Sequence, residues 1–95
     1  MLVLISYDVA TDSVNGKTRL RRIAKYCSDY GQRVQYSVFE CEVDPAQWVA
    51  LRQKLLATMD ESADSLRFYF LGSSWHRRIE HHGTKPSMDY GSLMI

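Results

Sequence analysis

One four-residue segment in the middle of the chain marks the start of a helix. Asp44-Pro45-Ala46-Gln47 combines a capping aspartate, a proline at the first helical position and a glutamine three residues after the cap, which is the signature of a capping box. Apolar residues then recur at helical spacing: Trp48, Leu51, Leu55 and Met59. The pattern predicts a helix that buries one face and ends near Asp60.

Strands are predicted on both sides of this helix. Residues 2 to 8 are nearly all apolar, as in a central strand, and residues 66 to 71 form another apolar run. Residues 33 to 43 are rich in β-branched and aromatic side chains, but their apolar positions change parity near residue 37, which indicates a bulge or a tight break. Residues 79 to 82 are a candidate for a short further strand.

A second helix is predicted over residues 16 to 30, where apolar side chains recur at helical spacing after a polar turn. The order is then strand, helix, broken strand, helix, strand. This is the order of an α+β, ferredoxin-like split β-α-β domain, in which two helices cover one face of an antiparallel sheet. We expect residues 1 to 95 to form a single domain, because a chain of this length cannot bury two cores.

The sequence also predicts a second copy of the chain as a partner. The chain contains more aromatic surface than two helices on one side of a sheet are expected to cover. The five aromatic residues concerned are Tyr7, Tyr36, Phe39, Phe68 and Phe70. A twofold homodimer formed through the open face of the sheet would bury the excess. The tail from about residue 83 to 95 ends in an apolar tip, and we expect it to dock on the partner's sheet edge.

No export or membrane segment is predicted. The apolar amino terminus has no basic leader and no cleavage site, and no apolar run approaches the roughly 20 residues of a membrane span. Cys27 and Cys41 lack the spacing of a metal site, so they are expected to be core residues. We therefore expect a cytoplasmic protein.

The charges are unevenly distributed although the formal net charge is only +1. Residues 17 to 33 contain many cations and a single acid, whereas residues 40 to 64 contain most of the acids. Four of these cations are candidates for sequence-independent, salt-sensitive contacts to phosphate: Arg19, Arg22, Lys25 and Arg33. A solvated helix face is an equally supported explanation.

Asp8 is the strongest candidate for chemistry. It stands at the carboxyl end of an apolar strand, where a carboxylate is costly to desolvate unless it caps a helix, pairs with a cation or binds a metal. In a twofold dimer, two such carboxylates near the axis could hold one Mg²⁺ that polarises a phosphodiester. The alternative, in which Asp8 caps the next loop or pairs with an arginine, stays open, and Asp12 is a weaker candidate for a second ligand.

Several segments resemble the CRISPR-associated Cas2 family. They are the start from Met1 to Val9, the helix segment from Arg19 to Lys25 and the strand segment from Gly31 to Glu42. The most specific element is Gln35-Tyr36-Ser37-Val38-Phe39-Glu40, together with Tyr7-Asp8 near the amino terminus. The segment from Arg78 to Gly83 is similar to the branch found in subtype I-C systems.

The resemblance implies a ferredoxin-like fold, a twofold homodimer and Asp8 as the catalytic Mg²⁺ ligand of an endonuclease that acts on RNA or DNA. It implies that the basic and aromatic surroundings of this site bind nucleic acid through Arg19, Arg22, Arg33 and Phe39. It also implies a role in CRISPR adaptation, in which the dimer bridges the Cas1 integrase and holds duplex DNA during spacer acquisition. Single-stranded RNA is a further expected partner.

The two implied roles make different demands on the chain. Hydrolysis requires Asp8 of both subunits within reach of one ion, whereas a scaffold requires only a cationic surface of suitable length. The sequence slightly favours the scaffold, because it contains no obvious general base beside Asp8. A ferredoxin-like dimeric module that binds a small ligand or senses a metal, without a nucleic-acid role, is the remaining alternative.

Overall fold

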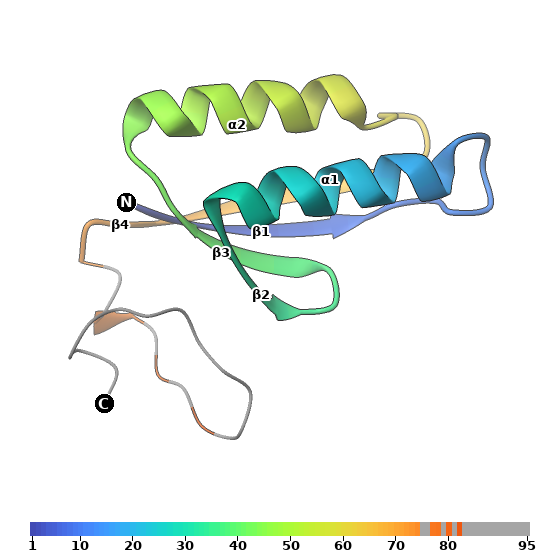
Figure 1. Cartoon of the computed structure of the whole chain (residues 1–95). Coiled ribbons are helices and arrows are strands. Elements are labelled where there is room, and N and C mark those ends of the chain that lie inside the picture. The colour runs from blue at the N-terminus through green and yellow to red at the C-terminus, as the bar shows by residue number, and fades with distance from the viewer. Residues whose placement is uncertain (75–76, 79, 81, 83–95) are drawn as a thin grey trace.

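The fold is a four-stranded antiparallel sheet with two helices on one face (Figure 1). The computed structural model of the chain describes residues 1–74, 77, 78, 80 and 82. Its elements are, in chain order, β1 (Leu2–Asp8), α1 (Gly16–Tyr30), β2 (Gly31–Gln35), β3 (Val38–Glu42), α2 (Pro45–Thr58) and β4 (Ser65–Gly72). The strands lie in the order β2-β3-β1-β4 across the sheet, and neighbours are antiparallel. The prediction of a ferredoxin-like α+β fold is confirmed.

The strand predicted over residues 33 to 43 is in fact a hairpin of two strands, β2 and β3, with Tyr36 and Ser37 in the turn. The turn explains the change of parity, because each strand has its own alternation. β2 starts at Gly31, directly after α1. A Cβ at Gly31 would lie 2.1 Å from the carbonyl oxygen of Glu40, so glycine is needed where the chain leaves the helix and pairs at once with β3.

The predicted capping box begins α2. The Asp44 carboxylate accepts a hydrogen bond from the backbone N–H of Gln47 at 2.7 Å, and the Gln47 side-chain oxygen accepts one from the Asp44 backbone N–H at 3.0 Å. Both bonds satisfy donors that the first turn of a helix leaves free. The helix then buries Trp48, Leu51 and Leu55 as predicted.

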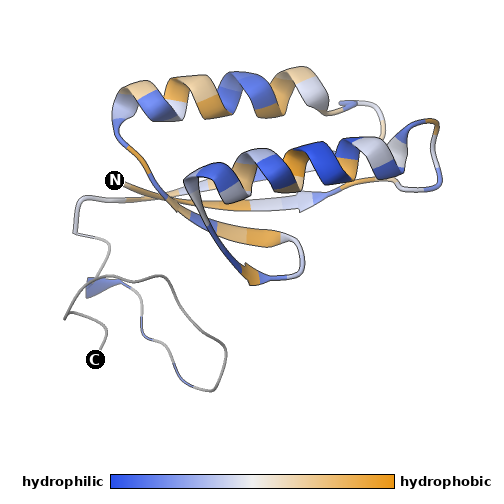
Figure 2. Cartoon of the chain, viewed as in Figure 1, coloured by the Kyte–Doolittle hydropathy of each residue, from blue (hydrophilic) through white to orange (hydrophobic). Residues whose placement is uncertain are grey.

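The core lies between the helices and the sheet. Hydrophobic and hydrophilic residues alternate along both helices (Figure 2), so each helix has an apolar side. The largest fully buried side chains are Phe39, Leu2, Ile5, Ile23, Leu51, Leu55, Val3, Cys27 and Cys41. Burial raises the pKa of both cysteine thiols to about 12, which fits their predicted core role. Neither helix in the described part of the chain combines the length and apolar character needed to cross a membrane.

The aromatic residues do not gather on the open face of the sheet, which corrects the premise of the dimer prediction. Tyr7 and Phe39 are buried on the helix side. Phe68 and Phe70 lie edge-on against Trp48 of α2, with ring centroids 4.8 and 5.5 Å away. The fifth aromatic residue is exposed in the turn between β2 and β3. The helix layer reaches over β4 through Trp48, but Phe70 stays 59% exposed, so this contact covers it only in part.

The open face of the sheet is mixed in character. Residues paired across antiparallel strands project to the same face, and the register places these side chains together on it: Leu4, Ser6, Asp8, Val38, Glu40, Arg67 and Tyr69. A homodimer through this face stays a prediction. The tail from about 83 to 95 lies outside the described residues, as do residues 79 and 81 of the candidate strand over 79 to 82.

Candidate metal site and nucleic-acid interface

Asp8 is the last residue of β1 and is exposed on the open face of the sheet. Its partner across the sheet is Ser65, the first residue of β4. Asp8 lines a hollow of about 240 Å³, together with Ser6, Tyr7, Ser65, Arg67 and Tyr69. The predicted ligand is therefore accessible and sits among other oxygen-bearing side chains.

The Asp8 carboxylate takes no part in the hydrogen bonds and ion pairs of the described residues. The loop that follows β1 is capped by a different aspartate, because the backbone N–H of Ala10 donates to Asp64 at 3.0 Å. The arginine pair considered for Asp8 is likewise formed by Asp64, with Arg19. Asp8 is thus left free for a ligand.

The donor set around Asp8 suits a hard cation in part. Mg²⁺ prefers oxygen ligands and commonly keeps several waters while using one or two carboxylates. The described residues contain no group of three His, Cys, Asp or Glu side chains placed to hold a metal, and Asp12 is not among the residues that line the hollow. One chain therefore offers a single carboxylate, so a second would have to come from another copy.

A second carboxylate near this site, Asp64, is not among the residues that the sequence predicts. Its side chain is fully buried and accepts hydrogen bonds from the guanidinium of Arg19 and from the backbone N–H groups of Ala10 and Asp60. The hydrogen bond from Arg19 is the main reason that the pKa of Asp64 falls to about 2, against the opposing effect of burial. Asp64 and Arg19 are 45 positions apart, so no local spacing reveals the pair.

Arg19 is engaged inside the chain, and its side chain is only 12% exposed. It bonds to Asp64 through Nε at 2.8 Å and Nη2 at 3.1 Å. Its remaining contacts are to the Val14 carbonyl and the Ser13 hydroxyl, both at 2.7 Å. The predicted contact of Arg19 to phosphate is untested, but its donors already have partners in the fold.

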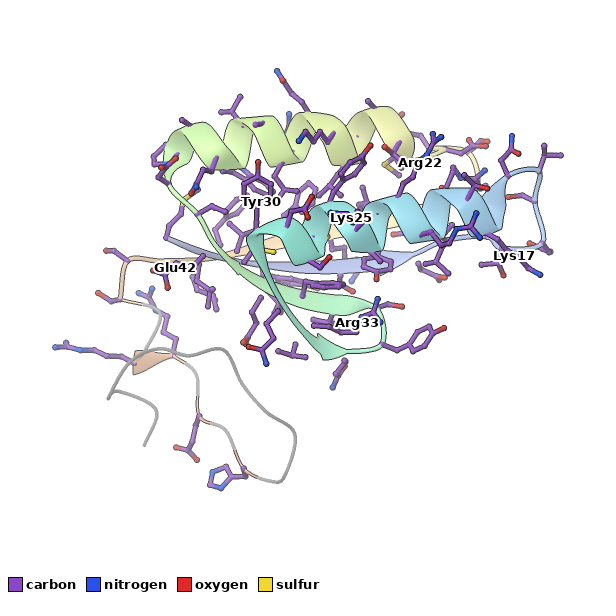
Figure 3. All side chains as sticks on the ribbon, viewed as in Figure 1. Lys17, Arg22, Lys25, Tyr30, Arg33 and Glu42 are labelled. Carbon is purple, nitrogen blue, oxygen red and sulfur yellow. The ribbon has the colours of Figure 1, made fainter. Side chains whose placement is uncertain are left out.

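The other cations of α1 are exposed along the helix. Figure 3 shows Lys17, Arg22 and Lys25 along α1 and Arg33 on the hairpin of β2 and β3. Arg22 lies beside a shallow depression lined by Thr18, Arg21, Arg22, Lys25 and Tyr26. Lys25 forms an ion pair with Asp29 one turn away, at 2.5 Å; such exposed pairs are weak. These side chains are therefore available to an anion in solvent.

Arg33 and Phe39 lie at a larger groove between α1 and β2, of about 840 Å³. The guanidinium of Arg33 stacks over the Phe39 ring at 5.1 Å and lies 5.8 Å from the centroid of Tyr36. The groove is lined by Arg21, Ala24, Lys25, Ser28, Gly31, Gln32, Arg33 and Phe39. Its three cations suit a sugar-phosphate chain, whereas the Phe39 ring is only 2% exposed and supports the Arg33 guanidinium from below.

Within one chain these residues lie apart from Asp8, and their place in the surroundings of the dimer site stays a prediction. Phe39 pairs with Ile5 across the sheet, and both are buried toward the helices. Ile5 and Asp8 are three positions apart on β1 and therefore project to opposite faces. Within one chain, the groove at Arg33 lies on the helix side of the sheet, whereas the hollow at Asp8 lies on its open face.

Comparison with known proteins settles the family. The family model described as "CRISPR associated protein Cas2" matches residues 1–79. The chain belongs to the Cas2 family. The match includes Asp8, the cations of α1, the groove between α1 and β2, and the buried Asp64.

Relatives in the Cas2 family are similar along the whole chain. A Chlorobaculum tepidum protein named CRISPR-associated endoribonuclease Cas2 is 63% identical over 95 residues, which cover 100% of this chain and 99% of the relative. A Halalkalibacterium halodurans protein named CRISPR-associated endonuclease Cas2 is 55% identical, again over 100% and 99% of the two chains.

A solved structure from the Cas2 family shares the fold. The crystal structure of Streptococcus pyogenes Cas2 at pH 6.5 superposes with a TM-score of 0.75 at 54% identity, covering 87% of this chain and all of that one. The ferredoxin-like arrangement inferred from the strand order is therefore shared with an experimental structure of this family.

Proposed function

We propose that this Cas2-family protein serves CRISPR adaptation, binds nucleic acid as a homodimer, and hydrolyses phosphodiester bonds of RNA or DNA with Mg²⁺ at Asp8. One observation carries the hydrolytic part: the exposed Asp8 carboxylate has no protein partner in the described chain and faces a hollow. The names of the relatives, endoribonuclease and endonuclease, point to the same chemistry.

Different residues of the hollow would bind the metal ion and the phosphate of the substrate. The carboxylate of Asp8 would hold the ion, with a second Asp8 contributed by another copy across the open face. When bound, Mg²⁺ would supply polarisation of the phosphodiester and activation of a water. Arg67 lines the same hollow and is exposed, so its guanidinium can bind the two non-bridging phosphate oxygens bidentately.

The nucleic-acid-binding part of the proposal rests on the cations of α1 and the groove beside it. Arg22 and Arg33 are exposed, and the Phe39 ring lines the groove under the Arg33 guanidinium. They would contact the sugar-phosphate backbone without reading sequence. Arg19 would reach a phosphate only after its pair with Asp64 opened.

The separation of the two surfaces also suits a scaffold. A duplex bound along α1 would not need to enter the Asp8 hollow of the same chain, so the dimer could hold DNA beside the Cas1 integrase without cutting it. We propose Cas1 as the partner in this role, which would be carried out in the cytoplasm. The scaffold is the second candidate function, and the opposite-face arrangement favours it.

The test compares wild type with Asp8→Asn, which keeps the size of the side chain but removes its charge. Cleavage of single-stranded RNA and of duplex DNA is followed over a Mg²⁺ titration, with EDTA as the blank. Asp12→Asn is the matched control, because it removes an exposed carboxylate from the neighbouring loop. We expect Asp8→Asn to lose at least roughly a hundredfold in rate and Asp12→Asn to retain wild-type activity.

Binding measured in parallel separates the alternatives. If wild type and Asp8→Asn both bind duplex DNA with a steep salt dependence and neither cleaves, the hydrolytic proposal is wrong and the scaffold stands. If the wild type neither cleaves nor binds nucleic acid, both are wrong, and the small-ligand module becomes the better hypothesis.

A further inference from the structure

The Asp8 hollow is built where two strand ends meet. β1 ends at Asp8, β4 begins at Ser65, and these two residues are partners across the sheet. The residue immediately before Ser65 is the buried Asp64. A shift of Asp64 would therefore be passed directly to β4, the strand that pairs with β1 at Asp8.

Asp64 also holds the segment of chain that follows Asp8. Its Oδ1 accepts a hydrogen bond from the backbone N–H of Ala10 at 3.0 Å, two residues after Asp8. Its Oδ2 accepts one from the backbone N–H of Asp60 at 2.9 Å. One carboxylate thus ties the segment that leaves β1 to the segment that enters β4.

Arg19 completes this connection from α1. Its guanidinium bonds to both oxygens of Asp64, and it also donates to Val14 and Ser13 in the loop after β1. The Ser13 hydroxyl in turn donates to the carbonyl of Ala10 at 2.6 Å. We call Arg19, Asp64 and Ser13 the clamp. A lysine could not replace Arg19, because an ammonium lacks the planar fork that serves several acceptors at fixed angles.

The clamp does not form part of the hollow itself. None of its three residues lines the hollow, and the side chains of Arg19 and Asp64 are 12% and 0% exposed. They can therefore act on a bound ion or phosphate only through the backbone that carries Asp8.

We propose that the clamp positions Asp8: Arg19 and Asp64 hold the backbone on both sides of the Asp8 hollow so that its carboxylate keeps the placement needed for Mg²⁺. This rests on the proposed function of Asp8. It assigns Arg19 a positioning role in place of a direct phosphate contact. Misplacement of a reacting group by about an ångström can cost on the order of a hundredfold in rate.

The test weakens the clamp and reads out metal use separately from substrate binding. Arg19→Lys and Ser13→Ala are compared with Arg52→Lys, a matched control on an exposed arginine of α2. For each protein we would measure kcat, KM for RNA, the Mg²⁺ concentration for half-maximal rate, Mg²⁺ affinity by calorimetry, duplex DNA affinity and thermal midpoint. Asp64→Asn is added where it is recovered folded.

For Arg19→Lys we expect kcat to fall roughly tenfold or more. The Mg²⁺ concentration for half-maximal rate should rise several-fold and the Mg²⁺ affinity should fall several-fold, while KM and duplex affinity stay within twofold of wild type. Ser13→Ala should shift the same quantities less, and Arg52→Lys should leave kcat and Mg²⁺ dependence unchanged.

Four outcomes would overturn the inference. Weaker duplex binding with a salt slope lower by about one would mean that Arg19 contacts phosphate directly. A lower thermal midpoint with unchanged Mg²⁺ dependence would mean that the clamp only stabilises the fold. A wild type without Asp8-dependent cleavage or Mg²⁺ binding would remove the proposed function along with the inference, whereas an active wild type with unaffected variants would remove the inference alone.

Discussion

Asp8 and Asp64 are both carboxylates at strand ends, but they are used in opposite ways. Asp8 is exposed and has no protein partner among the described residues, so its charge remains available to a ligand. Asp64 is buried, and its charge is satisfied by Arg19 and two backbone N–H groups. A buried carboxylate needs such partners, because desolvation would otherwise favour its neutral form. The charge of Asp64 therefore contributes to folding.

This pairing predicts a specific loss of stability in acid. The pKa of Asp64 is about 2 in the folded chain and near 3.8 ordinarily, so its contribution is present above pH 4 to 5 and is lost as the pH falls toward 2. We expect the contribution to be roughly 2 kcal/mol. Urea unfolding of wild type and Asp64→Asn should give a gap in unfolding free energy that is largest near pH 7 and narrows below pH 4.

Glu61→Gln is the control for this experiment, because Glu61 is an exposed carboxylate in the same loop. The difference in unfolding free energy between Glu61→Gln and wild type should stay small at every pH. Asp60 also has a lowered pKa, owing first to the hydrogen bond from Ser62, and it is present in both proteins. A gap between wild type and Asp64→Asn that does not change with pH would contradict the assignment.

At the scale of elements, α2 depends on its first turn. The capping box at Asp44 and Gln47 satisfies two backbone donors, one at the cap and one in the first turn, and the helix carries Trp48, Leu51 and Leu55 into the core. Trp48 also contacts Phe68 and Phe70 of β4. Fraying at the start of α2 would therefore loosen the strand that lines the Asp8 hollow.

We predict that Asp44→Ala lowers the free energy of unfolding by about 1 kcal/mol, which is typical for loss of an N-cap. The measurement is urea denaturation followed by circular dichroism. Gln53→Ala is a suitable control, because Gln53 is exposed on the same helix and far from the cap. Equal effects of the two substitutions would show that the cap contributes nothing specific.

At the scale of the whole molecule, one face of the sheet is covered by helices and the other is open (Figure 1). The open face has apolar area at Leu4, Val38 and Tyr69, surrounded by charged and polar residues that include Asp8. A twofold contact across this face would bring two Asp8 hollows toward each other. Dimerisation through this face would thus be coupled to the proposed metal site.

The expected result is a dimer of wild type at micromolar concentration in sedimentation velocity. Leu4→Lys should shift it toward monomer, since Leu4 lies on the central strand β1 and on the open face. Val49→Lys, on the exposed side of α2, should leave the sedimentation coefficient unchanged. A monomeric wild type, or a Leu4→Lys variant that remains dimeric, would exclude this face as the interface.

Local features of the sequence were enough to identify the elements and their order. The capping box, the apolar runs and the parity change near residue 37 are short-range signals, because helix caps, strand alternation and turns depend on neighbours in the chain. The resemblance to the Cas2 family also rested on short segments. Asp8 was recognised in the same way, as a charge at the end of an apolar strand.

Only the tertiary structure decided which residues meet. Arg33 and Phe39 lie on the opposite face of the sheet from Asp8. Strand register determines the face to which each side chain projects, and a shift of one position reverses that face. Arg19 was predicted as a free cation, yet it pairs with Asp64 from 45 positions away. Such a pair is created when α1 packs beside the start of β4, and no spacing in the sequence encodes that contact. The sequence by itself therefore determined the elements and the candidate ligand, whereas packing decided what surrounds that ligand and what holds it.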